Sequence, residues 1–194
     1  QSPNVWKNES PFLAVRAKTI KAPLAGAFKY AMALGLIHEG VDSGGWAKTE
    51  VNALRIGDVL VSTVPGELYS EIALGGIECK PGRDFEISPV EVPPYKTEGD
   101  SIARQFFTIG LANDEIGYII PKTQWDVKAP YVYEKSQYGE QNSGGPDVAG
   151  AIHKNTLELI REMNETFKNI PVKKAAETPA APATETPAPA PPAQ

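Results

Sequence analysis

Residues 51–72 read VNALRIGDVLVSTVPGELYSEI, and this stretch decides the fold. Two runs rich in aliphatic and β-branched residues flank Gly57-Asp58, and glycine in the first central position favours a two-residue hairpin turn. The second run stops at Pro65-Gly66, and Glu67 stands where an amphipathic segment begins. The stretch therefore predicts an antiparallel hairpin that leads into a helix, with a carboxylate at the junction.

Glu67 has two interpretations. A glutamate in the first turn of a helix is stabilised by the helix macrodipole, and this is the commoner reason to find one at such a place. A carboxylate at the end of a strand can also take part in chemistry, because open α/β sheets bind ligands where strand ends meet loops.

Further strands and helices are expected on both sides of the hairpin. Alternating apolar and polar residues predict a half-buried strand over 13–20, and an apolar run predicts a second over 105–112. Alanine and leucine enrichment favours a helix over 23–38. Apolar residues near a 3.6-residue period predict a helix over 147–169, with Asp147 placed to cap it.

Proline-rich and glycine-rich segments at 79–101 and 121–146 are typical of long irregular loops. Strands mixed with helices, and a hairpin that must be antiparallel, predict an α/β (α+β) fold, in which helices flank a mixed β-sheet. Residues 1–170 would form this partial domain. Residues 171–194, rich in proline and alanine, lack side chains large enough for a core and are expected to be a disordered tail.

Composition excludes several classes of function. The net charge is −5, with no basic run outside Lys173-Lys174, so no nucleic-acid partner is expected. No apolar stretch approaches the roughly 20 residues that span a bilayer, so no transmembrane segment is expected. A single cysteine rules out an internal disulfide.

Other residues are first interpreted as structural. His38 and His153 lie far apart and in no metal-binding motif, so we expect His38 to pack at a helix end and His153 to lie on the exposed side of the last helix. We expect Arg55 to lie on a solvated face. Interior packing is the preferred interpretation of the three tryptophans, although they could instead line a lipid groove: Trp6, Trp46 and Trp125.

A second strand end also carries polar groups. Asn113, Asp114 and Glu115 follow the 105–112 run, and Tyr118 lies just beyond them. If Glu67 and Tyr118 converge, their oxygens could hold a hard or borderline cation such as zinc. A structural tyrosine in a loop is the alternative for Tyr118.

Four pieces of the chain, in this order, resemble the neutral/alkaline ceramidase family. QSPN at 1–4 is similar to its S-P-N motif, and residues 51–72 resemble its strand followed by a PGE turn. FFTIGLANDEIGYIIP at 106–121 resembles its G-L-[SA]-N-x-x-x-x-Y segment, and YEKSQYG at 133–139 its Y-E…Y-G loop. The resemblance covers about residues 1–165.

The resemblance implies a zinc amidohydrolase that cleaves the N-acyl bond of ceramide or a related N-acyl lipid. By position, Glu67 and Tyr118 match residues that hold or approach the zinc, Ser2 a serine implicated in catalysis, and Tyr133 a tyrosine that can hydrogen-bond the reacting carbonyl. Zinc would polarise that carbonyl and lower the pKa of a bound water. Ser2 could be the nucleophile or could position water.

The family's zinc is also held by two histidines ahead of the S-P-N motif, and neither His38 nor His153 matches them. We therefore expect this chain to be the C-terminal part of a catalytic domain, inactive by itself, with the histidines upstream. The resemblance implies a lipid-like substrate and a secreted, periplasmic or cell-surface location, and it leaves peripheral contact with a membrane surface open. The alternative is a non-catalytic binding or interaction module on the same scaffold.

Overall fold

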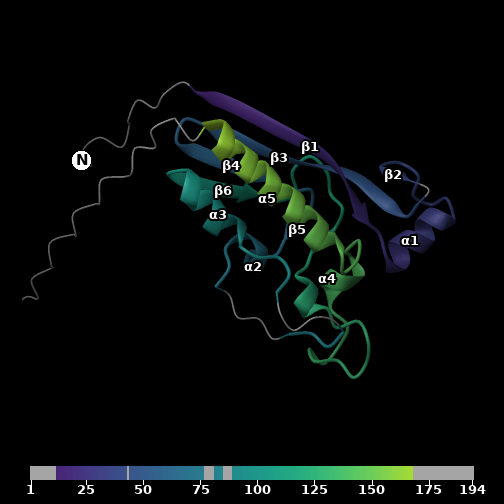
Figure 1. Ribbon diagram of the computed structural model, residues 1–194. Coiled ribbons are helices and arrows are strands. Elements are labelled where there is room, and N and C mark those ends of the chain that lie inside the picture. The colour runs from purple at the N-terminus through teal and green to yellow at the C-terminus, as the bar shows by residue number, and fades with distance from the viewer. Residues whose placement is uncertain (1–11, 43, 77–80, 85–88, 168–194) are drawn as a thin grey trace, which may run out of the picture.

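A five-stranded mixed sheet forms the centre of the protein (Figure 1). The computed structural model describes residues 12–42, 44–76, 81–84 and 89–167. The strands of this sheet are β1 (Leu13–Pro23), β3 (Trp46–Ile56), β4 (Val59–Thr63) and β6 (Gln105–Ile109) in spatial order, with β2 (Val41–Asp42) paired to the start of β3. Two short strands, β5 (Glu67–Leu68) and β7 (Tyr118–Ile119), form a separate parallel pair.

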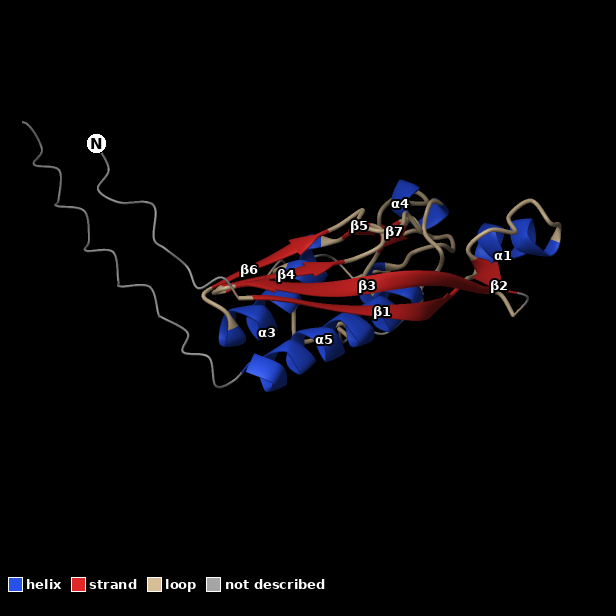
Figure 2. Ribbon diagram, turned by 90° about the horizontal axis from the view of Figure 1, so that it is seen from above, coloured by secondary structure: helices blue, strands red, loops and turns tan. Residues whose placement is uncertain are grey.

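Five α-helices accompany the sheets in the described part of the chain. They are α1 (Gly26–Ala33), α2 (Ser70–Ala73), α3 (Tyr95–Ile102), α4 (Tyr138–Gln141) and α5 (Val148–Phe167), and a 3-10 turn, η1, spans Lys122–Gln124. Helices α3 and α5 lie on one side of the large sheet, whereas α1 stands beyond its far end (Figures 1 and 2). The prediction of an α+β fold with a mixed sheet is confirmed.

The hairpin organises the sheet as predicted. Ile56 and Val59 are register partners, and Gly57 between them has a φ of 56°, which glycine adopts without strain. Strand β4 then pairs in parallel with β6, so the chain must cross over between them, and α3 lies in that crossover.

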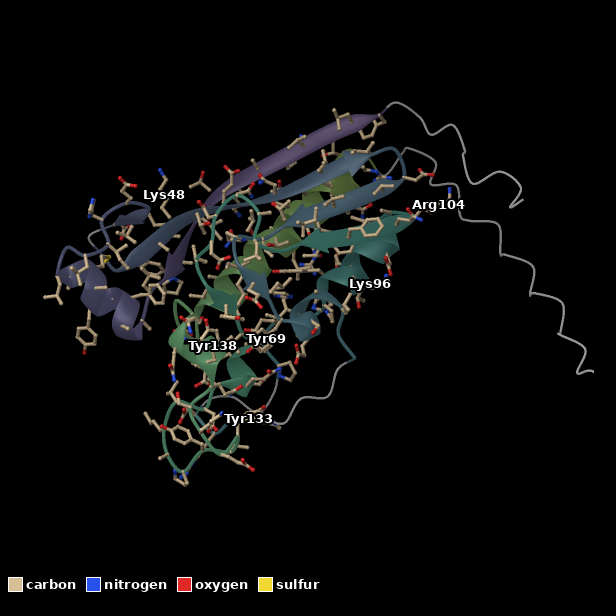
Figure 3. The ribbon with its side chains drawn as sticks, turned by 180° about the vertical axis from the view of Figure 1, so that it is seen from behind. Lys48, Tyr69, Lys96, Arg104, Tyr133 and Tyr138 are labelled. Carbon is tan, nitrogen blue, oxygen red and sulfur yellow. The ribbon has the colours of Figure 1, made fainter. Side chains whose placement is uncertain are left out.

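The core lies between the sheet and α5. Successive strand residues point to opposite faces, and one of each pair is buried against the helices. The fully buried members include Val51 and Leu60 from the strands and Ile152 and Ile160 from α5. None of the helices in the described part of the chain covers the opposite face of the sheet, which is seen in the view from behind (Figure 3).

Several element boundaries differ from the expectation. The helix predicted over 23–38 is shorter in the structure. Strand β1 continues to Pro23, so α1 begins only at Gly26, and it ends at Ala33. No residue of α1 is buried. The strand expected over 105–112 ends at Ile109. The segment 79–101, expected to be irregular, contains most of α3, and 121–146 contains η1 and α4. The final helix is confirmed over Val148–Phe167. The carboxylate of Asp147, predicted to cap this helix, accepts a bond from Lys122 Nζ at 2.7 Å.

The prediction for Arg55 is wrong. Its position in β3 faces the helices, and only 1% of the residue is exposed. Arg55 Nε donates to the Gly57 carbonyl at 3.0 Å, and burial lowers the pKa of the guanidinium while Asp58 opposes that shift. Strand alternation, not side-chain polarity, decides where this residue points.

Two helical glycines give a paired test of packing. A Cβ on Gly99 in α3 would lie 2.1 Å from the Phe106 ring, whereas one on Gly150 in α5 would have its nearest neighbour, Glu91 Oε1, at 4.0 Å. We expect Gly99→Ala to lower the free energy of unfolding by about 1–3 kcal/mol through overpacking. We expect Gly150→Ala to leave it unchanged or raise it by up to about 1 kcal/mol, the usual helical gain of alanine over glycine. Chemical denaturation measures both values, and equal effects of the two changes would contradict this packing.

Candidate functional site

Strands β5 and β7 bring Glu67 and Tyr118 together. The two residues are direct register partners in the parallel pair, and Glu67 N donates to the Gly117 carbonyl at 3.1 Å. A Cβ on Gly66 would lie 2.4 Å from that same carbonyl oxygen, so glycine at 66 lets the two backbones meet. The close approach of the two backbones thus explains the glycine in both PGE (65–67) and GY (117–118).

The side chains of the pair also meet. The Glu67 carboxylate, as a hydrogen-bond acceptor for the phenol, is the main reason why the pKa of Tyr118 is raised above its ordinary value. Burial and the charge of Glu67 raise the pKa further. The phenol therefore keeps its proton near neutral pH, and two oxygens from distant parts of the chain face each other at an exposed position.

Glu67 does not begin a helix. It lies in β5, and the helix that follows starts only at Ser70, with Glu71 as the acidic residue of its first turn. The macrodipole interpretation of Glu67 is therefore wrong, because the chain stays extended for two residues past the turn at Gly66.

Two further tyrosines surround Tyr118. The Tyr69 and Tyr138 rings stand nearly perpendicular to it, with centroids 6.4 Å and 5.9 Å away. Burial is the largest cause of the raised pKa of Tyr69, followed by the charges of nearby carboxylates. Tyr138, at the start of α4, remains 71% exposed. The sequence analysis missed both, although Tyr69 lies two residues after Glu67 and Tyr138 lies within the quoted YEKSQYG.

The other two predicted site residues are Tyr133 and Ser2. Tyr133 lies in the loop before α4, where its backbone N–H donates to Asp126 at 3.1 Å, and it contributes to the raised pKa of Tyr69. Figure 3 shows Tyr133, Tyr69 and Tyr138 at the same end of the molecule, far from Arg104. Ser2 and Trp6 lie outside the described residues.

Buried carboxylates hold the loop that carries Tyr133. Asp126, completely buried, accepts bonds from the backbone of Val132 and Tyr133, and Glu140 accepts one from Asp126 N at 2.6 Å. Burial raises the pKa of Glu140, and the charges of Asp126 and Asp84 raise it further. The loop over 121–137 is therefore ordered by side-chain bonds where regular structure is scarce.

An apolar cavity of about 320 Å³ adjoins α4. Its walls include Ala25 and Phe28 from the start of α1, Trp125, Glu140 and Pro146. The ring of Trp125 is buried, in agreement with interior packing, whereas Trp46 is half exposed on β3.

The two histidines do not belong to this site. His153, predicted to be exposed, is 4% exposed, with Nε2 2.9 Å from the Pro93 carbonyl and its ring stacked on Tyr95 at 5.3 Å. Burial lowers its pKa, so it is neutral near pH 7. His38, predicted to pack at a helix end, is exposed in the loop after α1. Throughout the described ranges, no group of three or more histidine, cysteine, aspartate or glutamate residues could hold a metal ion.

No protein-family model, curated protein or solved structure matches the chain. Within the described residues, none of the helices has the length and apolar character needed to cross a membrane. The argument for function therefore depends on the Glu67–Tyr118 pair itself.

The hydrogen bond between Glu67 and Tyr118 is testable by titration. Replacing the carboxylate in Glu67→Gln removes a charged acceptor, so we expect the pKa of Tyr118 to fall toward its ordinary value. Tyrosine ring-carbon NMR signals followed from neutral to alkaline pH measure this change. Glu39→Gln, in the exposed loop after α1, is the control and should leave Tyr118 unchanged. An unaltered Tyr118 titration in Glu67→Gln would show that the bond is absent in solution.

Glu91 provides a test of pH dependence. It is buried, its Oε1 accepts a bond from Lys122 N at 3.4 Å, and Oε2 has no hydrogen-bond partner among the described residues. Burial raises the pKa of this carboxyl, so the folded protein holds the proton to higher pH than the unfolded chain. Stability is then lost as pH rises from the ordinary glutamate pKa through the folded one.

We expect Glu91→Gln, which cannot ionise, to gain stability relative to the wild type as pH rises through that window. Unfolding free energies measured at several pH values between 4 and 8 (~1.4 kcal/mol for each unit of pKa shift) test this. A difference that does not change with pH would contradict it, and Glu39→Gln again serves as the control.

Proposed function

We propose that this chain is part of a zinc-dependent amidohydrolase of the neutral ceramidase type, which hydrolyses the N-acyl amide bond of ceramide or a related N-acyl lipid. One observation carries the proposal. Glu67 and Tyr118, 51 positions apart, are register partners whose side chains meet, and they are the two residues that the family resemblance assigns to the zinc.

The residues present fit half of a zinc site. A carboxylate and a phenol supply oxygen donors on adjacent strands, and the Glu67 side chain is exposed and accessible to an ion. Zinc sites in proteins are usually four-coordinate, with histidine the usual nitrogen ligand, and His38 and His153 both lie elsewhere. The remaining donors would then come from polypeptide outside residues 1–194. Bound zinc would polarise the amide carbonyl and lower the pKa of a water molecule.

The chain's own side chains have definable roles around this centre. Tyr118 keeps its proton until a cation competes for the oxygen, because Glu67 raises its pKa. Tyr133, in the loop before α4, is proposed to donate a hydrogen bond to the oxygen that becomes negative as the amide is attacked. Tyr138 is a second candidate for that donor, because its ring lies against Tyr118 and its side chain is exposed. Ser2 is proposed to act in catalysis, as nucleophile or by positioning water.

The substrate is proposed to be lipid-like, and the protein to act outside the cytoplasm, at a cell surface or in secreted form. The apolar cavity beside α4 supports an apolar substrate, since its walls adjoin the helix that carries Tyr138.

The test uses the complete product of the gene, supplied with zinc and an N-acyl sphingoid, with release of fatty acid as the readout. We expect Glu67→Ala to lower both zinc content and hydrolysis by about 100-fold or more, exceeding the effect typical of an outer-shell partner. Tyr118→Phe should lower both, while Tyr30→Phe on the exposed helix α1 should change neither. A wild-type protein that binds no zinc and releases no fatty acid would favour the non-catalytic binding module.

A further inference from the structure

The apolar cavity beside α4 has a carboxyl group in its wall. Its volume of about 320 Å³ lies at the lower end of the range for small-molecule sites, roughly 300–1,000 Å³. Its described walls come from the start of α1, from Trp125 and Val127, and from the segment between Glu140 and Pro146. Among these described residues Glu140 is the ionisable one, and Phe28 and Trp125 are the aromatic ones.

The Glu140 carboxyl has an acceptor to spare. Only 6% of the residue is exposed. Its Oε1 accepts bonds from Asp126 N at 2.6 Å and from Gln137 Nε2 at 2.9 Å, whereas Oε2 is buried and has no hydrogen-bond partner among the described residues. A buried polar oxygen without a partner is costly, so a ligand that donates to Oε2 would recover that cost on binding.

The electrostatic surroundings of Glu140 favour a positively charged donor. Burial is the largest cause of its raised pKa, and the charges of Asp126 and Asp84 raise it further. Asp126 is itself completely buried, and its Oδ1 has no partner among the described residues. The described walls of the cavity contain no lysine, arginine or histidine. A cation against Glu140 would relieve the repulsion among these carboxylates, which a neutral ligand cannot do.

An organic cation fits this cavity better than a metal ion does. Across the part of the chain that the structure describes, no group of three or more histidine, cysteine, aspartate or glutamate residues could hold a metal ion. The cavity walls are instead mainly apolar and include Trp125, whose ring is the aromatic side chain that attracts cations most strongly. The volume equals that of about ten water molecules at ~30 Å³ each, which is enough for an ammonium group on a short apolar chain.

A neutral alcohol is the competing ligand. Trp125 Nε1 is buried and also has no partner among the described residues. A hydroxyl group could accept a bond from Nε1 and donate one to Glu140, although it would leave the repulsion from Asp126 and Asp84 in place.

We propose that this cavity binds a small organic cation, an alkylammonium or arylalkylammonium ion whose head group pairs with Glu140 and whose apolar body lies against Phe28 and Trp125. The inference goes beyond the proposed function, which draws only on the apolar character of the cavity. Neither Glu67 nor Tyr118 is among its described walls, and the inference requires no zinc.

Three six-carbon probes test the site. Near pH 7, n-hexylamine carries a positive head group, 1-hexanol a neutral one and hexanoate a negative one. Each is titrated into the ¹⁵N-labelled 194-residue protein, and the amide NMR signals of Phe28, Glu140 and Gly145 report binding at the cavity.

We expect n-hexylamine to shift these signals with a Kd on the order of 1 mM. It should bind at least about tenfold more tightly than either of the other probes, because its bond to a carboxylate is charge-assisted. Absence of n-hexylamine binding would overturn the proposal. Equal binding of the three probes, or tighter binding of 1-hexanol, would assign the cavity to uncharged ligands and would also overturn it.

Glu140→Gln keeps the shape of the side chain and removes its charge. We expect it to weaken n-hexylamine binding at least about tenfold, whereas Glu39→Gln, in the exposed loop after α1, should leave that binding unchanged. Unchanged binding in Glu140→Gln, or equal weakening in the two variants, would contradict the role of this carboxyl.

A second pair of variants leaves the buried carboxyl untouched. Ala27→Leu adds bulk to the cavity wall, and Ala33→Leu adds the same bulk at the other end of α1, outside the described walls; both alanines are exposed. We expect Ala27→Leu to weaken n-hexylamine binding about fivefold or more and Ala33→Leu to bind as the wild type does. Equal binding by these two variants would place the ligand elsewhere and overturn the proposal.

These titrations use neither zinc nor an N-acyl substrate. A failure to bind n-hexylamine would therefore leave the proposed function standing, and a protein without hydrolytic activity would leave this cation site standing.

Discussion

The close approach of two backbones at Gly66 and Gly117 is the constraint on which the candidate site depends. A side chain at 66 would collide with the Gly117 carbonyl, and Gly117 itself has a φ of 90°, in the region that favours glycine. With both positions free of a Cβ, Glu67 N reaches that carbonyl and β5 pairs with β7. Two strands of two residues are too short to persist alone, and further backbone bonds fix their ends: Leu111 N donates to the Gly66 carbonyl, Ile116 N to that of Pro65 and Tyr118 N to that of Asn142. The close approach of the two backbones thus brings together residues that are distant in sequence.

The chemistry of that contact follows from its hydrogen bond. The Glu67 carboxylate, as the acceptor for the phenol and through its charge, is the main reason why the pKa of Tyr118 is raised. Under the proposed function, a cation that binds both oxygens would compete with the phenolic proton, so its affinity would increase with pH. The surrounding carboxylates, among them Glu71 and Glu140, add negative potential at the neighbouring Tyr69. The same field that raises the pKa values of the tyrosines would favour a cation over an anion at this position.

Local patterns in the sequence predicted local structure well. The hairpin at Gly57-Asp58 and the long helix α5 are confirmed, because turn chemistry and a 3.6-residue period are properties of neighbouring residues. Arg55 and His153 depart from the prediction, because that prediction equates polarity with exposure, whereas packing decides on which strand and helix faces they lie. The sequence suggested that Glu67 and Tyr118 converge, but Tyr69 and Tyr138 became visible only when β5, β7 and α4 were placed together. Contacts between distant segments have no periodic signature.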